Sequence, residues 1–564
     1  MRWIIVFQFC IAFTHFVNGA PYWVSPTGTV SWEAAKSSQI LNGTACASLK
    51  TANTNASAGD TIILRNGVYA TGISPSGSGT GEGHMIVYQA HTGETPTITG
   101  SDNSGTFFGI FINNKHYIKV DGVLIKDVDR WMSIRNSSSY IEIANSTFTD
   151  TDGRCVMIYI WGQCDGGTPY TCHVSNIWFH NNIVYNNGHV GNDCDDVGSL
   201  MYVGTPTSGD SNSNYITIEN NTFYWGAHHC VETFTKYNVL RNNYFHNEGF
   251  MDPPNGISCT FKPGENGKYG NRTIEVYDGH DRDGLFNLIE NNRFGTTGCP
   301  PDDNGGNAFI LVSKKNIARY NYMFNSMGDG IYFKQGAKAD SDSNAVYNNT
   351  VFKTGIAPEW RTDFRRGGIS ISDKSVGNRI KNNLIFLNGE DFKCIGSGCR
   401  FANNFIENNW TTDSGNPLFN NTDVSNPMND TLPDLTLQPG SPCINEGIHL
   451  TITSGANSKS TALKVVDALY FQDGSWGSSL ASLESDWIAV GTVDNVAEIA
   501  SIDYKTNTIT LATPLTWEDK AKVWLYRDSS GRVVLKGEKP DIGADESNYF
   551  LCLPKEFEPK PTRQ

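Results

Sequence analysis

The sequence predicts an all-β protein built as a right-handed parallel β-helix, a solenoid of short strands stacked in successive coils. Three observations predict this fold. The composition is rich in glycine and poor in charge, a phrase with paired asparagines recurs along the chain, and characteristic segments occupy both ends. The predicted solenoid carries an N-terminal cap helix and a small C-terminal β-module.

The composition is typical of a secreted all-β protein. Of the 564 residues, 38% are hydrophobic, 12% aromatic and only 18% charged, which suits one long solenoid with a polar, uncharged surface. The net charge of −15 repels phosphate backbones, so we expect no nucleic-acid partner. An anionic polysaccharide is still compatible with this charge, because local basic clusters or bound cations reverse the field inside a groove.

Residues 1–19 have the pattern of a signal peptide. Arg2 provides the positive charge, residues 3–17 are mainly apolar, and small residues stand at the −3 and −1 positions of a cleavage site after Gly19. The apolar run is short for a membrane span. We therefore expect cleavage, a secreted or extracellular protein, and no membrane span in the mature chain.

The repeated phrase is an apolar alternation followed by two asparagines, or a variant, and then an aromatic or aliphatic residue. Its shortest spacing, about 22 residues, is the length of one coil with three short strands, and longer spacings indicate inserted loops. Asparagine tolerates the left-handed backbone of a tight turn, and stacked asparagines hydrogen-bond along the solenoid. A propeller would show a steadier period of four strands. The phrase occurs at 141–148, 177–187, 216–225, 238–247, 287–294, 316–325, 344–352 and 378–386.

Segments at both ends of the chain resemble the entry and closing segments of right-handed β-helix proteins of the pectate-lyase-like superfamily. The resemblance implies a carbohydrate-active enzyme, although these motifs specify the fold more than the chemistry and identify no single family. The matching segments are YWVSPTG (22–28), AGDTIILRNGVY (58–69), HMIVYQA (84–90), TPTITG (95–100), SPCINEG (441–447) and KPDIGADE (539–546).

These patterns divide the chain into four parts. Residues 43–56 are expected to form a short helix that caps the open end of the core. The C-terminal module consists of strand-like runs with a hairpin connection at 504–507. It either packs on the last coil, the more common role, or binds carbohydrate. The parts are a signal peptide (1–19), the parallel β-helix (20–455), the small β-module (456–538), and a closing segment with the tail (539–564).

Thirteen cysteines fit an exported protein, and twelve remain after Cys10 leaves with the signal peptide. Cys394 and Cys399 are close enough in sequence to clip one loop. No pair of CxxC units is present, so disulfides are favoured over a zinc site, with their connectivity open. A second group comprises Cys155, Cys164, Cys172 and Cys194.

Outward side chains of a β-helix form columns, because every second strand residue faces out and successive coils lie about 4.8 Å apart. Alignment of the strands at 230–235 and 272–279 turns Val231 and Ile274 inward. It places Glu232 and Glu275 next to each other on the outer face. The predicted catalytic residues are Glu232, Glu275, Lys334 and His229. The predicted substrate-binding residues are His228, Arg272, Tyr332, Lys314 and Trp225.

Two carboxylates at this separation allow two reactions. In a glycoside hydrolase, one carboxyl group protonates the leaving oxygen while the other attacks carbon or activates water, and like-charge repulsion is expected to raise one pKa. In a uronate lyase, the carboxylates hold a Ca²⁺ that neutralises the substrate while a lysine or arginine removes a proton. The candidates for that base are Lys334, Lys314, Arg319 and Arg272. The order carboxylate, carboxylate, lysine is similar to that of uronan lyases of the chondroitinase-B and alginate-lyase type, whose fuller basic signature the chain lacks.

A second acidic segment suggests Ca²⁺, the one cofactor that the sequence indicates. Asp278, Asp281 and Asp283 lie near glycines in a D-x-x-D-x-D spacing, which departs from the EF-hand loop and is a weak metal motif. The loops 253–268 and 299–306 are expected to wall the same side of the solenoid, because long coil insertions commonly carry the binding face.

We therefore predict a secreted, monomeric polysaccharide-degrading enzyme that acts on an extended extracellular glycan, with glycoside hydrolysis slightly favoured over Ca²⁺-assisted lyase action. The alternatives are a non-enzymatic adhesin or structural glycan-binding β-helix, and an epimerase or other sugar-modifying enzyme. Irregular coils and charged residues between about 190 and 375 favour an active site over the uniform coils of an adhesin. The site prediction requires Glu232 and Glu275 to share one face.

Overall fold

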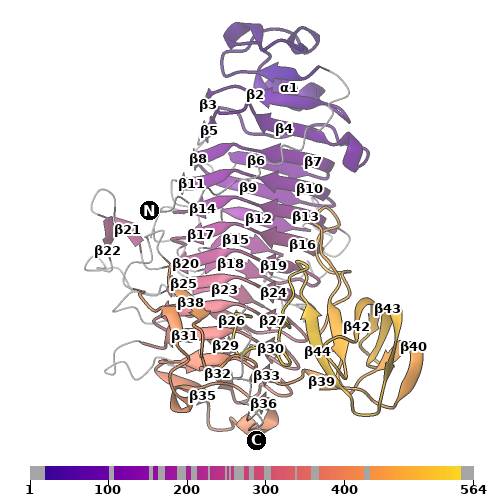
Figure 1. Cartoon of the computed structure of the whole chain (residues 1–564). Coiled ribbons are helices and arrows are strands. Elements are labelled where there is room, and N and C mark those ends of the chain that lie inside the picture. The colour runs from indigo at the N-terminus through magenta and orange to yellow at the C-terminus, as the bar shows by residue number, and fades with distance from the viewer. Residues whose placement is uncertain are drawn as a thin grey trace, which may run out of the picture.

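The computed structural model shows a long solenoid of stacked coils with a smaller β-module beside it (Figure 1). Most coils contribute one strand to each of three parallel sheets, which confirms the right-handed parallel β-helix. The structure describes residues 20–100, 107–151, 157–162, 172–186, 199–204, 213–226, 229–247, 250–252, 256–258, 272–277, 285–297, 306–336, 340–356, 367–424 and 432–547. The predicted signal peptide lies outside these residues.

The three sheets have 13, 11 and 10 strands in the described part of the chain. The thirteen-stranded sheet contains β1 (Tyr22–Val24), β2 (Thr61–Leu64), β4 (Ile86–Ala90), β7 (His116–Asp121), β10 (Ser139–Ala144), β13 (Ser175–His180), β16 (Asn214–Glu219), β19 (Val239–Arg241), β24 (Leu288–Glu290), β27 (Ile317–Arg319), β30 (Ala345–Tyr347), β33 (Arg379–Lys381) and β36 (Phe405–Glu407). The eleven-stranded sheet contains β3 (Gly67–Tyr69), β5 (Pro96–Gly100), β8 (Leu124–Val128), β11 (Thr147–Thr151), β14 (Ile183–Tyr185), β17 (Thr222–Tyr224), β20 (Tyr244–Asn247), β25 (Arg293–Thr297), β28 (Tyr322–Ser326), β31 (Thr350–Thr354) and β34 (Leu384–Phe386).

The ten-stranded sheet is the one that carries the predicted catalytic residues. It contains β6 (Phe108–Asn113), β9 (Arg130–Arg135), β12 (Ile158–Trp161), β15 (Ser199–Val203), β18 (His229–Thr233), β23 (Arg272–Val276), β26 (Phe309–Leu311), β29 (Ile331–Phe333), β32 (Gly367–Ser372) and β35 (Glu390–Ile395). Two short hairpins, β21 (Phe250–Asp252) with β22 (Gly256–Ser258) and β37 (Phe419–Asn421) with β38 (Asp434–Leu437), pair outside the solenoid sheets.

The core is a stack of apolar side chains that repeats from coil to coil. Strand pairing is in register, so that Ile118, Ile141 and Ile177 lie opposite one another on successive coils and are fully buried. Phenylalanines stack in the same way, and the rings of Phe223 and Phe245 lie 5.2 Å apart between their centroids. Alternation places every second residue in this core, which is why the apolar pattern of the repeat specifies the strands.

The two asparagines of a doublet have different structural roles. The first asparagine of the pair adopts a left-handed backbone, and at Asn242, with φ near 56°, its side chain is exposed. The second is buried and joins a ladder in which each side-chain amide donates to the next coil, for example Asn221 to Asn243 and Asn243 to Asn292, both at 3.0 Å. Both predicted roles of asparagine are therefore confirmed, each at its own position.

A short helix closes the N-terminal end of the core, as the sequence predicts for residues 43–56. Helix α1 (Leu49–Asn55) begins at Ser48, whose side chain accepts a hydrogen bond from the backbone N–H of Thr51 at 3.1 Å. Leu49 and Ala52 bury their side chains in the solenoid core. Single 3₁₀ turns occur at Glu33–Ala35, Gly43–Ala45, Glu82–His84, Phe401–Asn403 and Thr412–Ser414.

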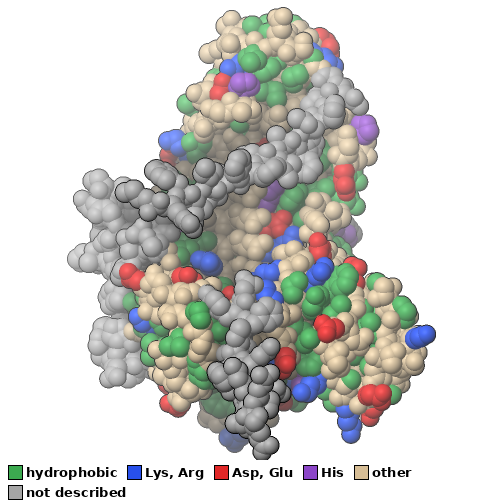
Figure 2. Space-filling view, viewed as in Figure 1, with side chains coloured by type: hydrophobic (Ala, Val, Ile, Leu, Met, Phe, Trp, Pro, Cys, Tyr) green, Lys and Arg blue, Asp and Glu red, His purple; other side chains and the backbone are tan. Residues whose placement is uncertain are grey.

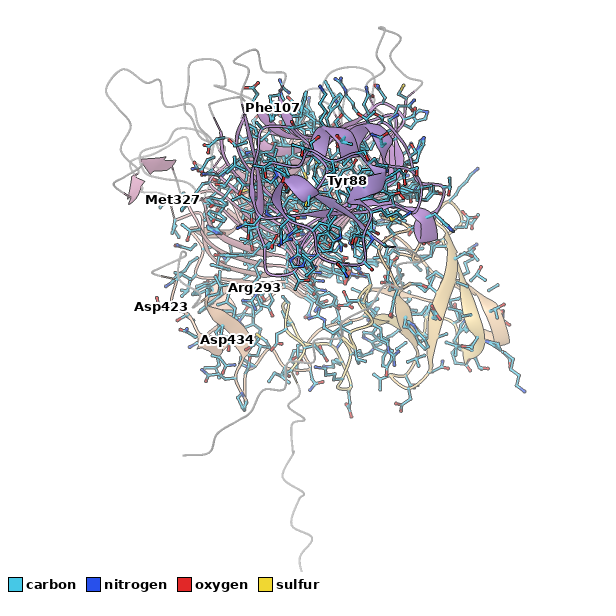
Figure 3. All side chains as sticks on the ribbon, turned by 90° about the horizontal axis from the view of Figure 1, so that it is seen from above. Tyr88, Phe107, Arg293, Met327, Asp423 and Asp434 are labelled. Atoms are coloured by element: carbon cyan, nitrogen blue, oxygen red, sulfur yellow. A yellow bond between two sulfur atoms is a disulfide. The ribbon has the colours of Figure 1, made fainter. Side chains whose placement is uncertain are left out.

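The C-terminal module is a six-stranded antiparallel sheet, and the predicted hairpin at 504–507 joins two of its strands. It packs along the flank of the thirteen-stranded sheet, beside several coils and not only the last, and Figure 3 shows it from above at the side of the solenoid. The backbone N–H of Ser479 donates to Asn176, and Asp486 accepts two hydrogen bonds from Arg319, several coils away. The strands are β39 (Thr451–Ile452), β40 (Asn457–Lys464), β41 (Trp487–Val490), β42 (Val496–Asp503), β43 (Thr508–Trp517) and β44 (Lys522–Arg527).

The module takes this place because the flank offers buried charge for it to pair with. Four charged residues form one outward column of the thirteen-stranded sheet. On successive coils they follow in the order Glu219, Arg241, Glu290 and Arg319. Unpaired buried charges are costly, and the module supplies Asp486 and backbone carbonyls as partners. Repeat patterns alone do not reveal such a docking surface.

The two closing phrases meet beside the last coils. The backbone N–H of Gly447 donates to the carbonyl of Pro540 at 2.7 Å, and that of Asn445 donates to the Asp541 carboxylate at 2.7 Å.

Cys394 and Cys399 form the predicted disulfide, and Cys172 is also disulfide-bonded. Cys46 and Cys443 are buried as free thiols, so pairing does not extend to every cysteine. Within the described residues, no helix is both long and apolar enough to cross a bilayer.

Candidate functional site

Glu232 and Glu275 lie directly opposite each other on adjacent strands of the ten-stranded sheet. Strands β18 and β23 pair in parallel, with Val231 opposite Ile274 in the core and Glu232 opposite Glu275 one residue later. Because neighbouring residues of a strand face opposite sides, both carboxylates belong to the outer face. The predicted stacking of the two glutamates is confirmed.

His229 joins the two carboxylates. Its Nε2 lies 2.9 Å from an Oε2 of Glu275, and its Nδ1 contacts Oε1 of Glu232. The imidazole has only 1% of its surface exposed, and Glu232 and Glu275 have 7% and 3%. A histidine held between two carboxylates this deeply is stabilised in its charged form.

Two further cations surround Glu275. The ammonium of Lys334, which directly follows β29, donates to Glu275 Oε1 at 2.9 Å. Arg272, three residues earlier in the same strand as Glu275, places Nη1 3.4 Å from Oε2. The cluster thus combines residues from three coils, and we name Glu232, Glu275, His229, Arg272 and Lys334 the charged cluster. Acidic and basic side chains also gather beside the C-terminal module, on the face that Figure 2 shows.

The pKa values of Glu275 and His229 both shift toward the ionised form. Burial by itself would raise the pKa of Glu275, but Lys334, His229 and Arg272 outweigh it and hold that pKa well below its usual range. Burial by itself would lower the pKa of His229, but Glu232 and Glu275 outweigh it and raise that pKa. The expected rise of one carboxyl pKa does not occur at Glu275, because its three cationic neighbours outweigh the effect of burial.

Two residues beside Glu232 were not predicted. The hydroxyl of Ser199 donates to Glu232 Oε1 at 3.3 Å, and Tyr202 lies opposite Glu232 in the pairing of β15 with β18. Burial, followed by the charge of Glu232, raises the pKa of the Tyr202 phenol. Alignment of the segment SLMYVG (199–204) with HCVETF (229–234) would have placed Tyr202 opposite Glu232 and Ser199 opposite His229, since the two segments are neighbouring strands of the same sheet.

Aromatic rings continue this face along the solenoid axis. Tyr159 meets Tyr202 edge to face at 5.9 Å, Tyr202 meets Phe234 at 5.4 Å, and Phe234 meets Tyr277 at 5.6 Å. The ammonium of Lys334 lies 5.9 Å from the centre of the Tyr277 ring. Aromatic walls with a few convergent polar groups are characteristic of sites for organic ligands.

The other predicted site residues are dispersed. Tyr332 lies in the same outward column as Glu275, with Ile310 between them, and is 3% exposed. Trp225 follows β17 at a corner of the coil and packs against Tyr185 and Tyr224 of the eleven-stranded sheet. The ammonium of Lys314 pairs with Asp342 at 2.9 Å.

Arg319 does not belong to the outer face of the ten-stranded sheet. It lies on the thirteen-stranded sheet, fully buried against the module, and its guanidinium binds Asp486 and Glu290. The prediction that Arg319 serves as a base is therefore wrong. The spacing of the repeat predicts where a residue lies within its coil. It does not predict which sheet the module covers, because that depends on tertiary packing.

His228 and the three aspartates Asp278, Asp281 and Asp283 lie outside the described residues. Within the parts of the chain that are described, no three His, Cys, Asp or Glu side chains gather as a metal site would require. Long connections adjoin the ten-stranded sheet, among them residues 162–174, 186–198, 248–271 and 298–308. The predicted loops 253–268 and 299–306 fall within these connections.

No protein-family model and no curated protein matches the chain. Similar solved structures include pectate lyase Pel9A, with 14% identity and a TM-score of 0.44 over 78% of this chain and 95% of that chain. They also include the GH136 lacto-N-biosidase from Eubacterium ramulus (13%, TM-score 0.46, 69% and 67%) and XylC in complex with xylose (13%, TM-score 0.44, 93% and 98%). At this level of identity the likeness concerns the fold and carries nothing about activity.

Proposed function

We propose that this protein is a secreted polysaccharide-degrading enzyme that hydrolyses glycosidic bonds of an extended glycan lying along the outer face of the ten-stranded sheet. The observation that carries the proposal is the pair Glu232 and Glu275, opposite each other on adjacent coils and joined through His229. A pair of carboxyl groups in different electrostatic environments is what acid-assisted glycoside cleavage needs.

The two carboxyl groups receive different roles. Glu275 stays ionised, because Lys334, His229 and Arg272 stabilise its charge, and it opposes the positive charge that develops on the sugar. Glu232 has fewer cationic neighbours among the described residues and is the group we assign to proton transfer at the glycosidic oxygen. Ser199 and Tyr202 orient its carboxyl group from the preceding coil.

The surroundings suit a polymer more than a small molecule. The outward column runs along the solenoid axis, and aromatic rings from Tyr159 to Tyr277 extend over several coils. An aromatic ring offers the apolar face of a sugar a large contact at little conformational cost. A chain of sugar units can therefore contact the sheet on both sides of the charged cluster.

Cleavage by β-elimination is the second candidate, and the cations favour it. In this reaction a base removes the proton beside a sugar carboxylate, the bond to the glycosidic oxygen breaks, and the leaving oxygen takes up a proton. Lys334 and Arg272 would neutralise the carboxylate in the place of a Ca²⁺ ion. Three cations next to Glu275 would repel Ca²⁺, so these residues do not fit a calcium site at the glutamate pair.

The decisive experiment incubates the mature protein and its Glu232→Gln variant with a panel of neutral and acidic polysaccharides. New reducing ends without ultraviolet absorbance indicate hydrolysis, whereas an absorbing unsaturated sugar indicates elimination. We expect reducing ends from the wild type and none from Glu232→Gln. Tight binding without any cleavage across the panel would reject enzymatic action and favour a glycan-binding adhesin.

A further inference from the structure

A second group of cations lies on the ten-stranded sheet, nearer the N-terminus than the charged cluster. Arg130 and Arg135 are the first and last residues of β9, and Arg135 lies opposite Trp161 of β12. The outward column runs from Ser133 through Tyr159 and Tyr202 to Glu232, so these arginines are three coils away from the cluster. That separation is about 14 Å along the solenoid axis.

In the part of the chain that the structure describes, neither arginine pairs with an acid. Arg130 stacks on the ring of Tyr159 at 5.1 Å and Arg135 on the ring of Phe111 at 4.5 Å. Among the described residues, no carboxylate forms an ion pair with either of them, although the chain has a net charge of −15. Arginines elsewhere on the solenoid, such as Arg241 and Arg319, do form such pairs.

Among the described residues of this region, three buried donors have no hydrogen-bond acceptor. They are Nε of Arg130, Nε of Arg135 and the indole Nε1 of Trp161. Buried polar groups in folded proteins are almost always satisfied, and an exception calls for a missing partner. Guanidinium and indole groups donate only, so the missing partner must be rich in acceptors.

We propose that Arg130, Arg135 and Trp161 form a subsite for negatively charged sugar units, so that the glycan recognised on this face carries carboxylate or sulfate groups. This inference rests on the proposed function and specifies its substrate class. Guanidinium groups bind such planar or tripodal oxyanions through paired hydrogen bonds, and the aromatic rings hold the guanidinium planes in place. The Tyr159 and Trp161 rings, 5.1 Å apart, supply contact for the sugar itself.

The charge along the face is consistent with an acidic glycan. Arg272 and Lys334 continue the cationic residues on the far side of Glu232, and both retain exposed surface of 15% and 26% on their side chains. A row of cations on one face of an acidic protein attracts a polyanion to that face and not elsewhere. The subsite lies about three sugar-length steps from the cleavage position, so it sets the register of the chain without contacting the reacting bond.

The test measures binding separately from cleavage. Calorimetry on the mature protein with Glu232→Gln, which prevents turnover, compares hexagalacturonate, a sulfated hexasaccharide and neutral cellohexaose. We expect an acidic ligand to bind more tightly than the neutral one, with an affinity that falls as sodium chloride is added. Adding Arg130→Gln and Arg135→Gln should weaken acidic binding by about tenfold for each arginine and leave neutral binding unchanged.

Arg293→Gln is the matched control, because Arg293 also stacks on a tyrosine, Tyr322 at 5.7 Å, but belongs to the eleven-stranded sheet. It should leave all affinities unchanged. Equal binding of neutral and acidic ligands, or an acidic affinity unaffected by the double substitution in a protein with unchanged melting temperature, would overturn the inference. Arginine-dependent acidic binding by a wild type that cleaves none of these glycans would instead reject the proposed function alone.

Discussion

His229 is the residue that couples the two glutamates. It contacts both carboxylates and is itself almost completely buried, so its charge depends on both. A buried ion pair contributes little net stability, but removing one partner leaves an uncompensated charge and is costly. Substitutions in the charged cluster therefore affect chemistry and stability differently, and the two can be measured separately.

Replacement of Glu232 should abolish cleavage without unfolding the protein. We expect Glu232→Gln to lower kcat by at least about 100-fold, because the amide cannot transfer the proton. Glu142→Gln is the control: Glu142 also contacts a histidine, His180 at 3.2 Å, and is 8% exposed, but it lies on the thirteen-stranded sheet. Equal loss of activity in both variants would show that the effect is not specific to the site.

Replacement of His229 should reveal a pH-dependent contribution to stability. Folding raises the pKa of His229, so its stabilising effect is complete below the unfolded value of about 6.5 and is lost as pH rises through the folded value. We expect His229→Gln to cost about 3–5 kcal/mol near pH 5 to 6, and less at alkaline pH. Denaturant unfolding across this range measures it, and a difference that grows with pH would contradict the assignment.

At the scale of elements, the asparagine doublet explains how one short phrase builds a turn and a ladder together. The exposed member tolerates a left-handed backbone, while the buried member satisfies backbone groups of the coil before it. Asn243, for example, donates to the carbonyl of Ile218 and accepts from the backbone N–H of Asn221. A turn that otherwise buries unpaired groups becomes fully hydrogen-bonded.

The two members of one doublet should differ in their tolerance of substitution. We expect Asn243→Ala to cost about 1–3 kcal/mol for each buried group that it leaves unpaired. Asn242→Gly should change stability by only a few tenths of a kcal/mol, because glycine adopts φ near 56° without strain. Chemical denaturation of both variants provides the comparison, and similar costs at the two positions would refute the division of roles.

At the scale of the whole molecule, the module and the solenoid meet across buried charge. Arg319 lies between Glu290 of the preceding coil and Asp486 of the module, and all three have no exposed surface. Asp528 of the same module segment accepts a hydrogen bond from Asn291 at 3.2 Å. More acidic than basic side chains meet at this interface, so the protonation of the acidic groups changes how stably the module binds the solenoid.

This interface should weaken as the pH rises toward neutrality. Burial, with Asp528 and Asp486, raises the pKa of Glu290 to about 7 against the opposing effect of Arg319. The folded protein then binds a proton that the unfolded chain releases above about pH 4.3, so stability falls between that value and pH 7. Glu290→Gln should remove this decline in melting temperature, whereas Glu407→Gln, an exposed residue of the same column, should not.

Much of the fold was predictable because it is encoded locally. Alternating apolar residues, doublets such as Asn242 and Asn243, and the hairpin at 504–507 each act over a few residues, and the structure shows all of them. Assigning Val231 and Ile274 to the core was enough to place Glu232 opposite Glu275, since parallel pairing in register preserves the inward and outward alternation from coil to coil.

What the sequence by itself determined is the period: the strands, the turns, and which side chains of a strand face out. Only the tertiary structure decided which outward residues meet, namely that His229, Lys334 and Arg272 converge on Glu275 while Arg319 lies beneath the module. The reason is physical. Alternation is a property of one strand, whereas the pKa of a carboxyl group and the partner of a cation depend on charges contributed by other coils, whose distance is set by packing.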